Sequence, residues 1–316
     1  MGGDDNMPQY SIVVPVYNSE KTLELLYKRV TEIFEAKYNG DFELVLVDDC
    51  SQDHSAEVMR LLREQDPRVK IIFLAKNFGQ HRALLCGFHN CKGEYIITMD
   101  DDLQHPPEEI PKLIEYMQAH SDVDVVVGNY LVKKHGIVRN MGTKMTNWFT
   151  SKIFHKNKNL HLTSFRLMKR YVVEGICDIQ VANPRIGHLL LQVTNRIRNV
   201  DVRHDSRLYG KSGYSFGRLV RDFTNNILNN SDLPLAILGR LGFFSFIISI
   251  LMIIYYIARY FIFGLSVQGF TTIVVLLLAL GGLILFGIGL IGRYMIQLNS
   301  EVKKIPNYVI RSKEVD

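Results

Sequence analysis

The chain has 316 residues, of which 47% are hydrophobic, and a formal net charge of +5. This length suffices for one sizeable α/β domain and an additional segment. A basic chain suits nucleic acid, a membrane surface or an anionic substrate. The sequence has no dense run of lysine and arginine with interleaved aromatic residues, which argues against a nucleic-acid partner.

The cysteines indicate a reducing compartment. Cys50, Cys86, Cys91 and Cys177 form no CxxC pair and have no histidine at a zinc-binding spacing, so we expect reduced, partly buried thiols. Residues 1–10 contain no apolar stretch, and we therefore expect no signal peptide. Both features predict that the soluble part of the chain lies in the cytoplasm.

The first half of the chain alternates strand-like and helix-like segments. Short apolar runs predict strands at residues 11–16, 42–48, 69–74, 95–100 and 123–128. Helical periodicity and start signals predict helices at residues 22–37, 55–65, 81–90 and 107–120. Apolar strands separated by helices predict an α/β fold with a mostly parallel sheet covered on both faces. Ligands of such sheets bind beyond the carboxyl ends of the strands.

Acidic residues follow two of these strands. Asp48 and Asp49 end the second strand, and Asp100, Asp101 and Asp102 end the fourth. Adjacent carboxylates repel one another, and their oxygens are ligands that Mg²⁺ or Mn²⁺ prefers. A solvated acidic turn that caps the next helix is the alternative. Because the three aspartates directly follow an apolar strand and two more end another, we favour a metal site that neutralises a diphosphate.

The C-terminal part of the chain is strongly apolar. Residues 241–258 and 269–292 contain no charged residue, and as helices they would span about 27 Å and about 36 Å, against a bilayer core of about 30 Å. Two buried core helices are the alternative. The short link at residues 259–268 predicts a transmembrane hairpin. Basic residues flank its outer ends, which places those ends in the cytoplasm: Arg240, Arg293, Lys303 and Lys304.

A helix with one apolar face precedes the hairpin. Phe216, Leu219, Val220, Phe223 and Ile227 recur at helical spacing, which predicts an amphipathic helix in the membrane interface. An ordinary surface helix is the alternative. We therefore divide the chain into four parts: a cytoplasmic domain at 1–212, a juxtamembrane helix at 213–234, two transmembrane helices at 235–292 and a cytoplasmic tail at 293–316.

Five motifs in their order and spacing resemble family 2 glycosyltransferases of the GT-A fold. They are VVPVYNSE (13–20), LVDDCSQD (46–53), NFGQHRALLCGF (77–88), MDDDLQHPPEEIPKL (99–113) and FRLMKR (165–170). With the hairpin, the chain resembles the polyprenyl-phosphate branch of that family. The branch includes dolichyl-phosphate mannose synthases, bactoprenol glucosyltransferases and the undecaprenyl-phosphate aminoarabinose transferase.

The resemblance implies roles for residues on the donor side. Contacts to the nucleobase and ribose are implied for Pro15, Tyr17, Glu20 and one of Asp48 and Asp49. The DxDxQ pattern falls on Asp100, Asp102 and Gln104, which implies that they bind the metal and the donor diphosphate, with Asp101 in the variable middle position.

The resemblance also implies residues on the acceptor side. Arg139 and Thr143 match an element that holds the acceptor phosphate, and Arg166 and Arg207 match positions near the diphosphate or the acceptor. Lys211 is a further candidate for the acceptor phosphate. For each arginine, a structural or surface ion pair is the alternative.

The chain departs from the branch at three places. Residues 128–130 read GNY where the branch often has GSR, so one arginine is missing and Lys133 or Lys134 is a candidate replacement. Residues 162–164 read LTS where the branch often carries an aspartate. The final lysine of RxxGxSK is replaced by Gly213.

The predicted reaction is a metal-dependent, inverting, single-displacement transfer of a sugar from a nucleotide-sugar, with UDP favoured by resemblance. The expected acceptor is a polyprenyl phosphate at the cytoplasmic face of the membrane, and the expected assembly is a homo-oligomer. A processive polysaccharide synthase is disfavoured because the chain has no QxxRW motif, and a channel or flippase because neither span contains a charge. Two alternatives stay open: a non-catalytic membrane scaffold that retains the fold, and a family 2 transferase with another acceptor.

Overall fold

The computed structural model describes residues 7–130, 160–181, 183–203, 205 and 306–315, together with scattered positions between 244 and 298. The chain divides into two compact units, one of residues 1–212 with 304–316 and one of residues 213–303. Among the described residues of the whole chain, no helix is both long enough and apolar enough to cross a bilayer. The segments expected to form the spans and the amphipathic helix lie largely or wholly outside the described residues.

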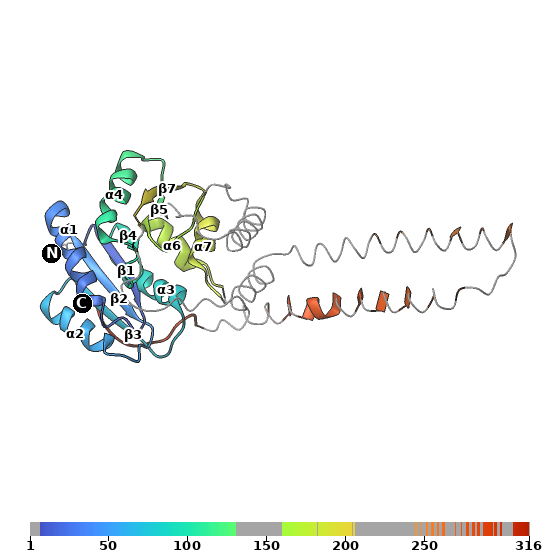
Figure 1. The fold of residues 1–316 in the computed structure, drawn as a ribbon, viewed down its shortest axis with the longest axis horizontal. Helices are drawn as coiled ribbons and strands as arrows, with labels where there is room; N and C mark the ends of the chain where they lie inside the picture. Colours follow the sequence, from blue (N-terminus) through green and yellow to red (C-terminus); the bar gives the residue numbers. More distant parts are fainter. Residues whose placement is uncertain are drawn as a thin grey trace, which may run out of the picture. The chain divides into compact units, whose positions relative to one another are not determined.

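The first unit is built on a mixed sheet with helices on both faces (Figure 1). Its strands are β1 (Tyr10–Val16), β2 (Phe42–Asp48), β3 (Val69–Leu74), β4 (Tyr95–Thr98), β5 (Val125–Tyr130), β6 (Arg166–Lys169), β7 (Ile197–Val202) and β8 (Ile310–Glu314). The helices are α1 (Leu23–Tyr38), α2 (Ser55–Gln65), α3 (Gln80–Asn90), the 3₁₀ turn η1 (Pro107–Glu109), α4 (Ile110–Ala119), α6 (Arg170–Asp178) and α7 (Ile186–Val193). The elements predicted up to residue 128 are present, with bounds that differ by a few residues.

The strand order has a topological switch point beside β1. The strands are arranged as β7-β5-β6-β4-β1-β2-β3-β8, and β1 pairs in parallel with both β2 and β4. The chain leaves β1 toward β2 and β3 and then returns to the other side of β1 as β4. This reversal separates the connections that follow β1 and β4, and in open α/β sheets ligands bind at such a point.

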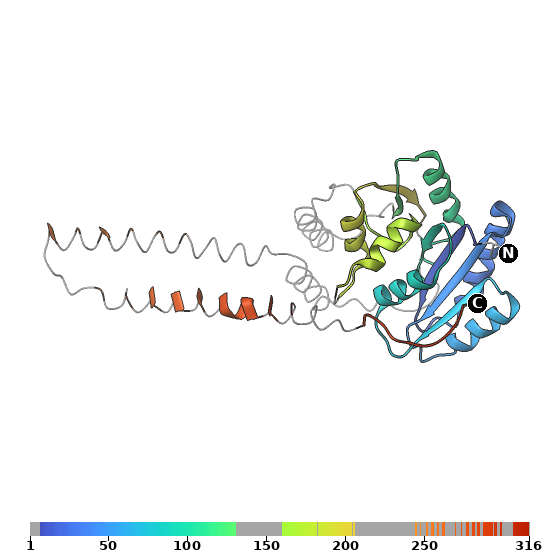
Figure 2. The ribbon, with the colours of Figure 1, turned by 180° about the vertical axis from the view of Figure 1, so that it is seen from behind.

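Alternation along the strands divides the core into two layers. Val14 and Leu46 face a cluster with α1, α2 and α4, whereas Val13 and Val45 face a cluster with α3, α6 and α7. Figure 1 shows α1 and α2 on the left of the strands and α3 and α6 on the right, and Figure 2 shows the same layers from behind. Both faces of the central strands are therefore covered, and only their ends are open to ligands.

Several elements were not predicted from the sequence. The antiparallel strand β6 joins β4 to β5, and β7 pairs in parallel with β5. The tail, expected only as a cytoplasmic extension, ends in β8, which pairs antiparallel with β3; the dark red segment lies beside β3 in both views (Figures 1 and 2). Because β8 has exposed polar residues, IRSKE, on an edge of the sheet, it carries little apolar signal.

Candidate active site

The loop that follows β1 is held in place by neighbouring loops. Asn18 has a φ of 54°, its backbone N–H donates to Ser51 Oγ at 3.0 Å, and its side-chain oxygen accepts from Gln52 N at 2.8 Å. The backbone N–H of Ser19 donates to Ser55 Oγ at 2.8 Å. These contacts fix the loop while leaving Tyr17 46% exposed.

The two aspartates that end β2 lie in different surroundings. Asp49 accepts from Phe78 N at 2.6 Å and from Gly79 N at 2.8 Å, a contact that Gly79 permits with a φ of 92°. Burial raises the pKa of Asp49, and these hydrogen bonds partly oppose that shift. Asp48 is buried and accepts from Ser51 N at 3.1 Å. Of the two, Asp49 lines the cavity at the carboxyl edge.

The three aspartates after β4 point in three directions. Asp100 accepts from Gln80 Nε2 at 2.6 Å and from Ser164 Oγ at 2.7 Å. Asp101 accepts from Tyr17 N at 3.0 Å and from the hydroxyl of Ser19. Asp102 accepts from Gln104 N at 3.1 Å.

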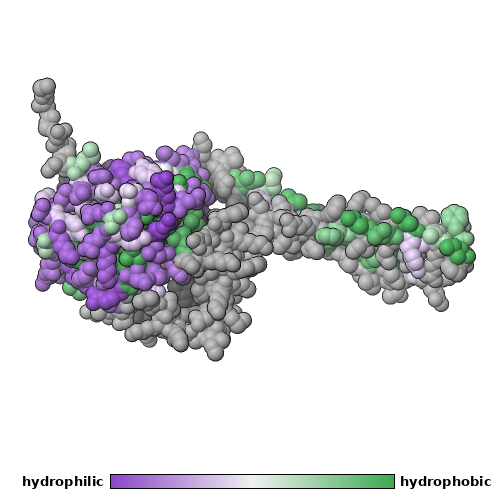
Figure 3. Space-filling model, turned by 90° about the horizontal axis from the view of Figure 1, so that it is seen from above, coloured by the Kyte–Doolittle hydropathy of each residue, from purple (hydrophilic) through white to green (hydrophobic). Residues whose placement is uncertain are grey.

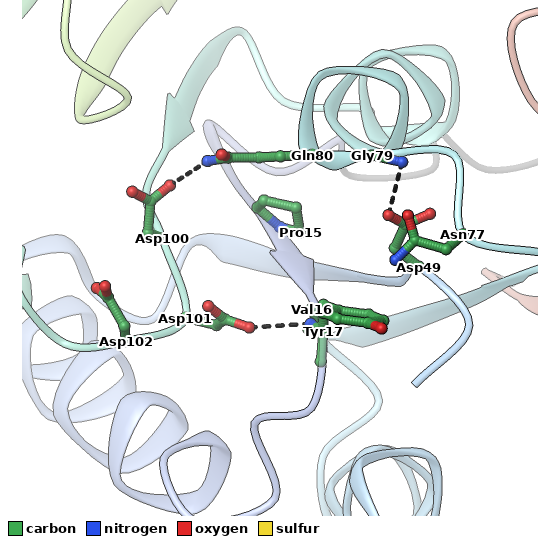
Figure 4. Close-up of a pocket in the computed structure, with 10 residues that line it drawn as sticks. All are labelled: Pro15, Val16, Tyr17, Asp49, Asn77, Gly79, Gln80, Asp100, Asp101 and Asp102. Atoms are coloured by element: carbon green, nitrogen blue, oxygen red, sulfur yellow. Dashed lines mark hydrogen bonds between the residues drawn. The ribbon is translucent and has the colours of Figure 1, made fainter. Parts of the chain in front are cut away.

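A cavity of about 250 Å³ opens at this edge of the sheet. Figure 4 shows its ten lining residues, which are Pro15, Val16, Tyr17, Asp49, Asn77, Gly79, Gln80, Asp100, Asp101 and Asp102. A second cavity of about 420 Å³ shares Tyr17, Asp101 and Asp102 and is also lined by Glu20 and Asp53. Together they are of the size that a small organic ligand needs. The tertiary structure thus brings five of the residues expected to bind the donor to one place: Pro15, Tyr17, Asp49, Asp100 and Asp102, with Glu20 beside them.

The carboxylates suit a divalent cation only together with ligands from a substrate. In the described part of the chain, no group of three or more His, Cys, Asp or Glu side chains is arranged to hold a metal ion. Mg²⁺ needs only one or two protein carboxylates when phosphate oxygens and water complete its coordination. Asp100 and Asp102 line one cavity and offer such oxygens. The third expected ligand, Gln104, does not line either of these two cavities.

Arg166 is a buried cation close to Asp100. Its residue is only 4% exposed, and it pairs with Thr98 of β4 at the carboxyl edge of the sheet. Nη2 donates to the carbonyl oxygen of Thr163, whereas Nε and Nη1 have no hydrogen-bond partner in the described part of the protein. Burial lowers the pKa of Arg166 to about 10, a shift that the negative charge of Asp100 opposes. Burying a cation without a full set of partners is costly, and Arg166 lines neither of the two cavities described above.

His105 closes the other side of the aspartate turn. Its ring stacks on Tyr130 with centroids 5.3 Å apart and on Phe165 with centroids 5.5 Å apart, and Nε2 contacts the Tyr130 hydroxyl. Burial raises the pKa of Tyr130. The residues at the position of the expected GSR element, Gly128 to Tyr130, therefore supply packing and a hydroxyl contact in place of an arginine.

The expected acceptor-phosphate residues lie outside the described residues. They are Arg139, Thr143, Arg207 and Lys211, and the same holds for the candidate replacements Lys133 and Lys134. The structure thus describes the predicted donor side of the site and, of the predicted arginines, only Arg166.

Sequence reasoning missed two residues that position Asp100. Gln80 opens α3, and Ser164 lies where the branch often has an aspartate. Gln80 lies within the motif NFGQHRALLCGF (77–88), and its place in that motif could have marked it as a candidate site residue. Ser164 was noted only as a departure, and its contact with Asp100 depends on the antiparallel pairing of β6 with β4.

Comparison with known proteins places this site in a family. The family model described as glycosyl transferase family 2 matches residues 11–175. Among similar proteins is an undecaprenyl-phosphate 4-deoxy-4-formamido-L-arabinose transferase of Photorhabdus laumondii, which is 30% identical over 97% of this chain and 94% of its own length. The protein of the same description from Yersinia pestis is 30% identical over 98% of this chain and 95% of its own length.

A solved structure shows the same fold at low sequence identity. Glucosyl-3-phosphoglycerate synthase from Mycobacterium tuberculosis, in complex with Mn²⁺, UDP and phosphoglyceric acid, has a TM-score of 0.54 and 15% identity. The match covers 71% of this chain and 78% of that protein. The likeness supports the GT-A-like α/β fold expected from the sequence. The family model matches more than half of the present chain, and the sheet order and the cavity at the carboxyl edge of the sheet agree with it. This chain is therefore a member of glycosyl transferase family 2.

Proposed function

We propose that this glycosyltransferase moves a sugar from a nucleoside-diphosphate sugar to a polyprenyl phosphate at the cytoplasmic face of a membrane. The observation that carries the proposal is that the loop after β1 and the aspartates after β4 line one cavity at the carboxyl edge of the sheet. The relatives described as undecaprenyl-phosphate transferases, aligned over nearly their whole length, support the acceptor.

The donor side begins with a nucleoside. Tyr17, Pro15 and Glu20 line the two cavities, and the exposed ring of Tyr17 offers a face on which a base can stack. Asp49 holds the backbone of Phe78 and Gly79 at the cavity wall. We favour UDP because the structural neighbour binds UDP. In this arrangement the diphosphate of the donor faces Asp100 and Asp102.

Asp100 and Asp102 would hold Mg²⁺ or Mn²⁺ together with oxygens of the diphosphate. When bound, the cation stabilises the negative charge that develops on the leaving diphosphate. Gln80 and Ser164 keep the Asp100 carboxylate oriented. The backbone N–H of Gln104 orients Asp102. For Gln104, the third residue of the DxDxQ pattern, we therefore propose a positioning role.

The acceptor needs cationic groups more than a base. A phosphate monoester has a second pKa of roughly 6, so most of it is already a dianion at neutral pH. Arg166 is a buried cation near Asp100, and we propose that its positive charge attracts such an anion toward the site. We propose Arg139, Thr143, Arg207 and Lys211 as further acceptor residues. Direct attack by the phosphate oxygen displaces the nucleoside diphosphate in one step and inverts the anomeric carbon.

Membrane attachment would bring the site to its lipid acceptor. Large apolar side chains in the second unit are well exposed, for example Phe261 at 80%, Ile262 at 70% and Leu277 at 64%. Figure 3 shows hydrophobic colour at such described positions. Apolar surface of this extent is stable when lipid or protein covers it. We therefore propose that the apolar segments at 241–258 and 269–292 span the membrane, and that copies of the chain associate there.

A donor screen tests the proposal. Purified full-length protein is incubated with undecaprenyl phosphate, Mg²⁺ or Mn²⁺, and a panel of UDP- and GDP-sugars, and the lipid product is identified by mass. We expect one glycolipid that requires the metal, and none from Asp102→Ala. The exposed Asp122→Ala is the matched control and should retain full activity. A wild-type protein that forms no glycolipid with any donor would instead favour the non-catalytic scaffold.

A further inference from the structure

The middle carboxylate of the acidic turn does not face the same way as its neighbours. Figure 4 shows Asp101 turned toward Tyr17, whereas Asp100 points toward Gln80. One oxygen of Asp101, Oδ2, accepts from the backbone N–H of Tyr17 at 3.0 Å and also from the hydroxyl of Ser19. Asp101 therefore contacts the loop that the proposed function assigns to the nucleoside.

The position of Asp101 is electrostatically unfavourable. Its carboxylate stands between those of Asp100 and Asp102 in the chain, and like charges this close repel one another. A small apolar residue would fill the middle position without this cost. The contacts to Tyr17 and Ser19 are what the carboxylate supplies in return.

Asp101 joins the loop that follows β1 to the turn that follows β4. The loop of residues 17–20 is held on its far side by Ser51 of the loop after β2 and by Ser55, the first residue of α2. Asp101 accepts two hydrogen bonds from this loop, one from Tyr17 N and one from the Ser19 hydroxyl. A displacement of the aspartate turn is therefore transmitted to the loop through Asp101.

We propose that Asp101 is a positioning residue that couples the nucleoside-binding loop to the metal-binding carboxylates on either side of it. The inference rests on the proposed function, which places the nucleoside at Tyr17 and the cation at Asp100 and Asp102. A cation held by the flanking aspartates fixes the backbone of the turn, and Asp101 then holds the loop in its binding conformation. By linkage, a bound nucleoside strengthens metal binding by the same factor.

Free nucleosides isolate this coupling. A nucleoside diphosphate contacts the cation directly, so its metal dependence says nothing about the protein. Uridine and guanosine lack phosphates, and a metal can change their affinity only through the protein. We would measure the affinity of the full-length protein for both nucleosides, and for UDP and GDP, by calorimetry with and without Mn²⁺.

The wild type should bind one nucleoside about fivefold or more tightly when Mn²⁺ is present, which lies within the usual range of coupling between sites. In Asp101→Ala this ratio should fall to one, while the matching nucleoside diphosphate keeps its metal dependence. The KM for the nucleotide-sugar should rise about tenfold, the effect of losing a hydrogen bond to a charged group, with a much smaller change in kcat.

Three further variants separate coupling from general loosening of the loop. Asp101→Asn keeps an oxygen that can accept from Tyr17 N and should retain most of the coupling, whereas Ser19→Ala should lower it. Ser51→Ala loosens the same loop from its far side, so it should weaken nucleoside binding equally with and without Mn²⁺. If Asp101→Ala fails to fold, the comparison of Ser19→Ala with Asp101→Asn still tests the coupling, because only Ser19→Ala should lower it clearly.

The outcomes distinguish this inference from the proposed function. A metal-dependent nucleoside affinity that persists in Asp101→Ala, or that is absent from the wild type while UDP or GDP binds with Mn²⁺, would refute the coupling role and leave the donor site standing. Failure of the wild type to bind any of the four ligands would refute the donor site itself, and the coupling role with it.

Discussion

Gln80, the first residue of α3, donates a hydrogen bond to Asp100 in the turn after β4. The amide Nε2 of Gln80 lies 2.6 Å from Asp100 Oδ1, and Ser164 Oγ lies 2.7 Å from Oδ2 of the same carboxylate. Both oxygens of Asp100 are thus oriented by neutral donors. Neutral donors fix the direction of a carboxylate without neutralising its charge, and the nearby cation of Arg166 interacts with that charge.

Loss of the Gln80 amide should therefore disturb the proposed metal site more than the fold. We expect Gln80→Ala to lower kcat about tenfold and to raise the Mn²⁺ concentration needed for half-maximal activity, because one hydrogen bond to a charged group is lost. Activity is measured as a function of Mn²⁺ concentration. Gln65→Ala, at the exposed end of α2, is the matched control. Equal metal requirements in the two variants would show that Gln80 does not orient Asp100.

The buried Arg166 should favour activity at the expense of stability. Arg166→Met removes a desolvated cation with two unused donors and replaces it with an apolar chain of similar length. We expect its free energy of unfolding to fall by no more than about 1 kcal/mol, the value of the single bond to Thr163, while transfer is largely lost. Stability is measured by denaturant unfolding of the detergent-solubilised protein.

Arg68→Met provides the contrast for this prediction. Arg68 pairs with Asp66, whose side chain is 6% exposed, at 2.8 Å. Its loss should cost about 1–3 kcal/mol of stability, because it leaves a buried carboxylate without its partner, and it should leave transfer unchanged. An Arg166→Met variant that is as unstable as Arg68→Met would mean that Arg166 is a structural residue.

Gly79 should be intolerant of a side chain because of its backbone conformation. A residue with a Cβ is strained at a φ of 92°, although nothing lies within 4 Å of the position that a Cβ would take. Gly79→Ala should cost about 1–3 kcal/mol of stability and weaken donor binding, because it moves the N–H that donates to Asp49. Thermal unfolding and UDP binding are the measurements. Gly187→Ala, where a Cβ would meet Leu162 at an ordinary 3.5 Å, should be nearly neutral.

His81 should make stability depend on pH. Burial, together with the positive charges of Arg166, Arg185 and His188, lowers its pKa to about 4. The unfolded chain, with an ordinary histidine pKa near 6.5, takes up the proton first as the pH falls. The contribution of His81 is therefore present above about pH 6.5 and is lost as the pH falls toward about 4.

Denaturant unfolding at several pH values tests this dependence. In His81→Gln the free energy of unfolding should change less between pH 6.5 and pH 4 than in the wild type. The exposed His120→Gln should keep the slope of the wild type. Identical slopes for the wild type and His81→Gln would show that His81 does not titrate at a lowered pKa.

The sequence by itself determined the alternation of strands and helices in residues 10–120 and the position of the acidic residues at strand ends. These features are local, since periodicity of 2 or 3.6 residues and the residues that end an element are written along the chain. The family also follows from short motifs at fixed spacing, because their order and spacing are written along the chain. Pro15, Tyr17, Asp49, Asp100 and Asp102 could therefore be named as candidate site residues before it was known that they line one cavity.

Only the tertiary structure decided which groups meet. The contact between Asp101 and Tyr17 joins residues 84 positions apart, and the contact between Ser164 and Asp100 joins residues 64 apart. Each depends on the pairing of β4 with β1 on one side and with β6 on the other. The pairing of the strands, including that of β8 with β3, depends on packing between segments that are distant in the sequence. The burial of Arg166 depends on such packing as well. A local sequence pattern does not say which distant segments will pack together.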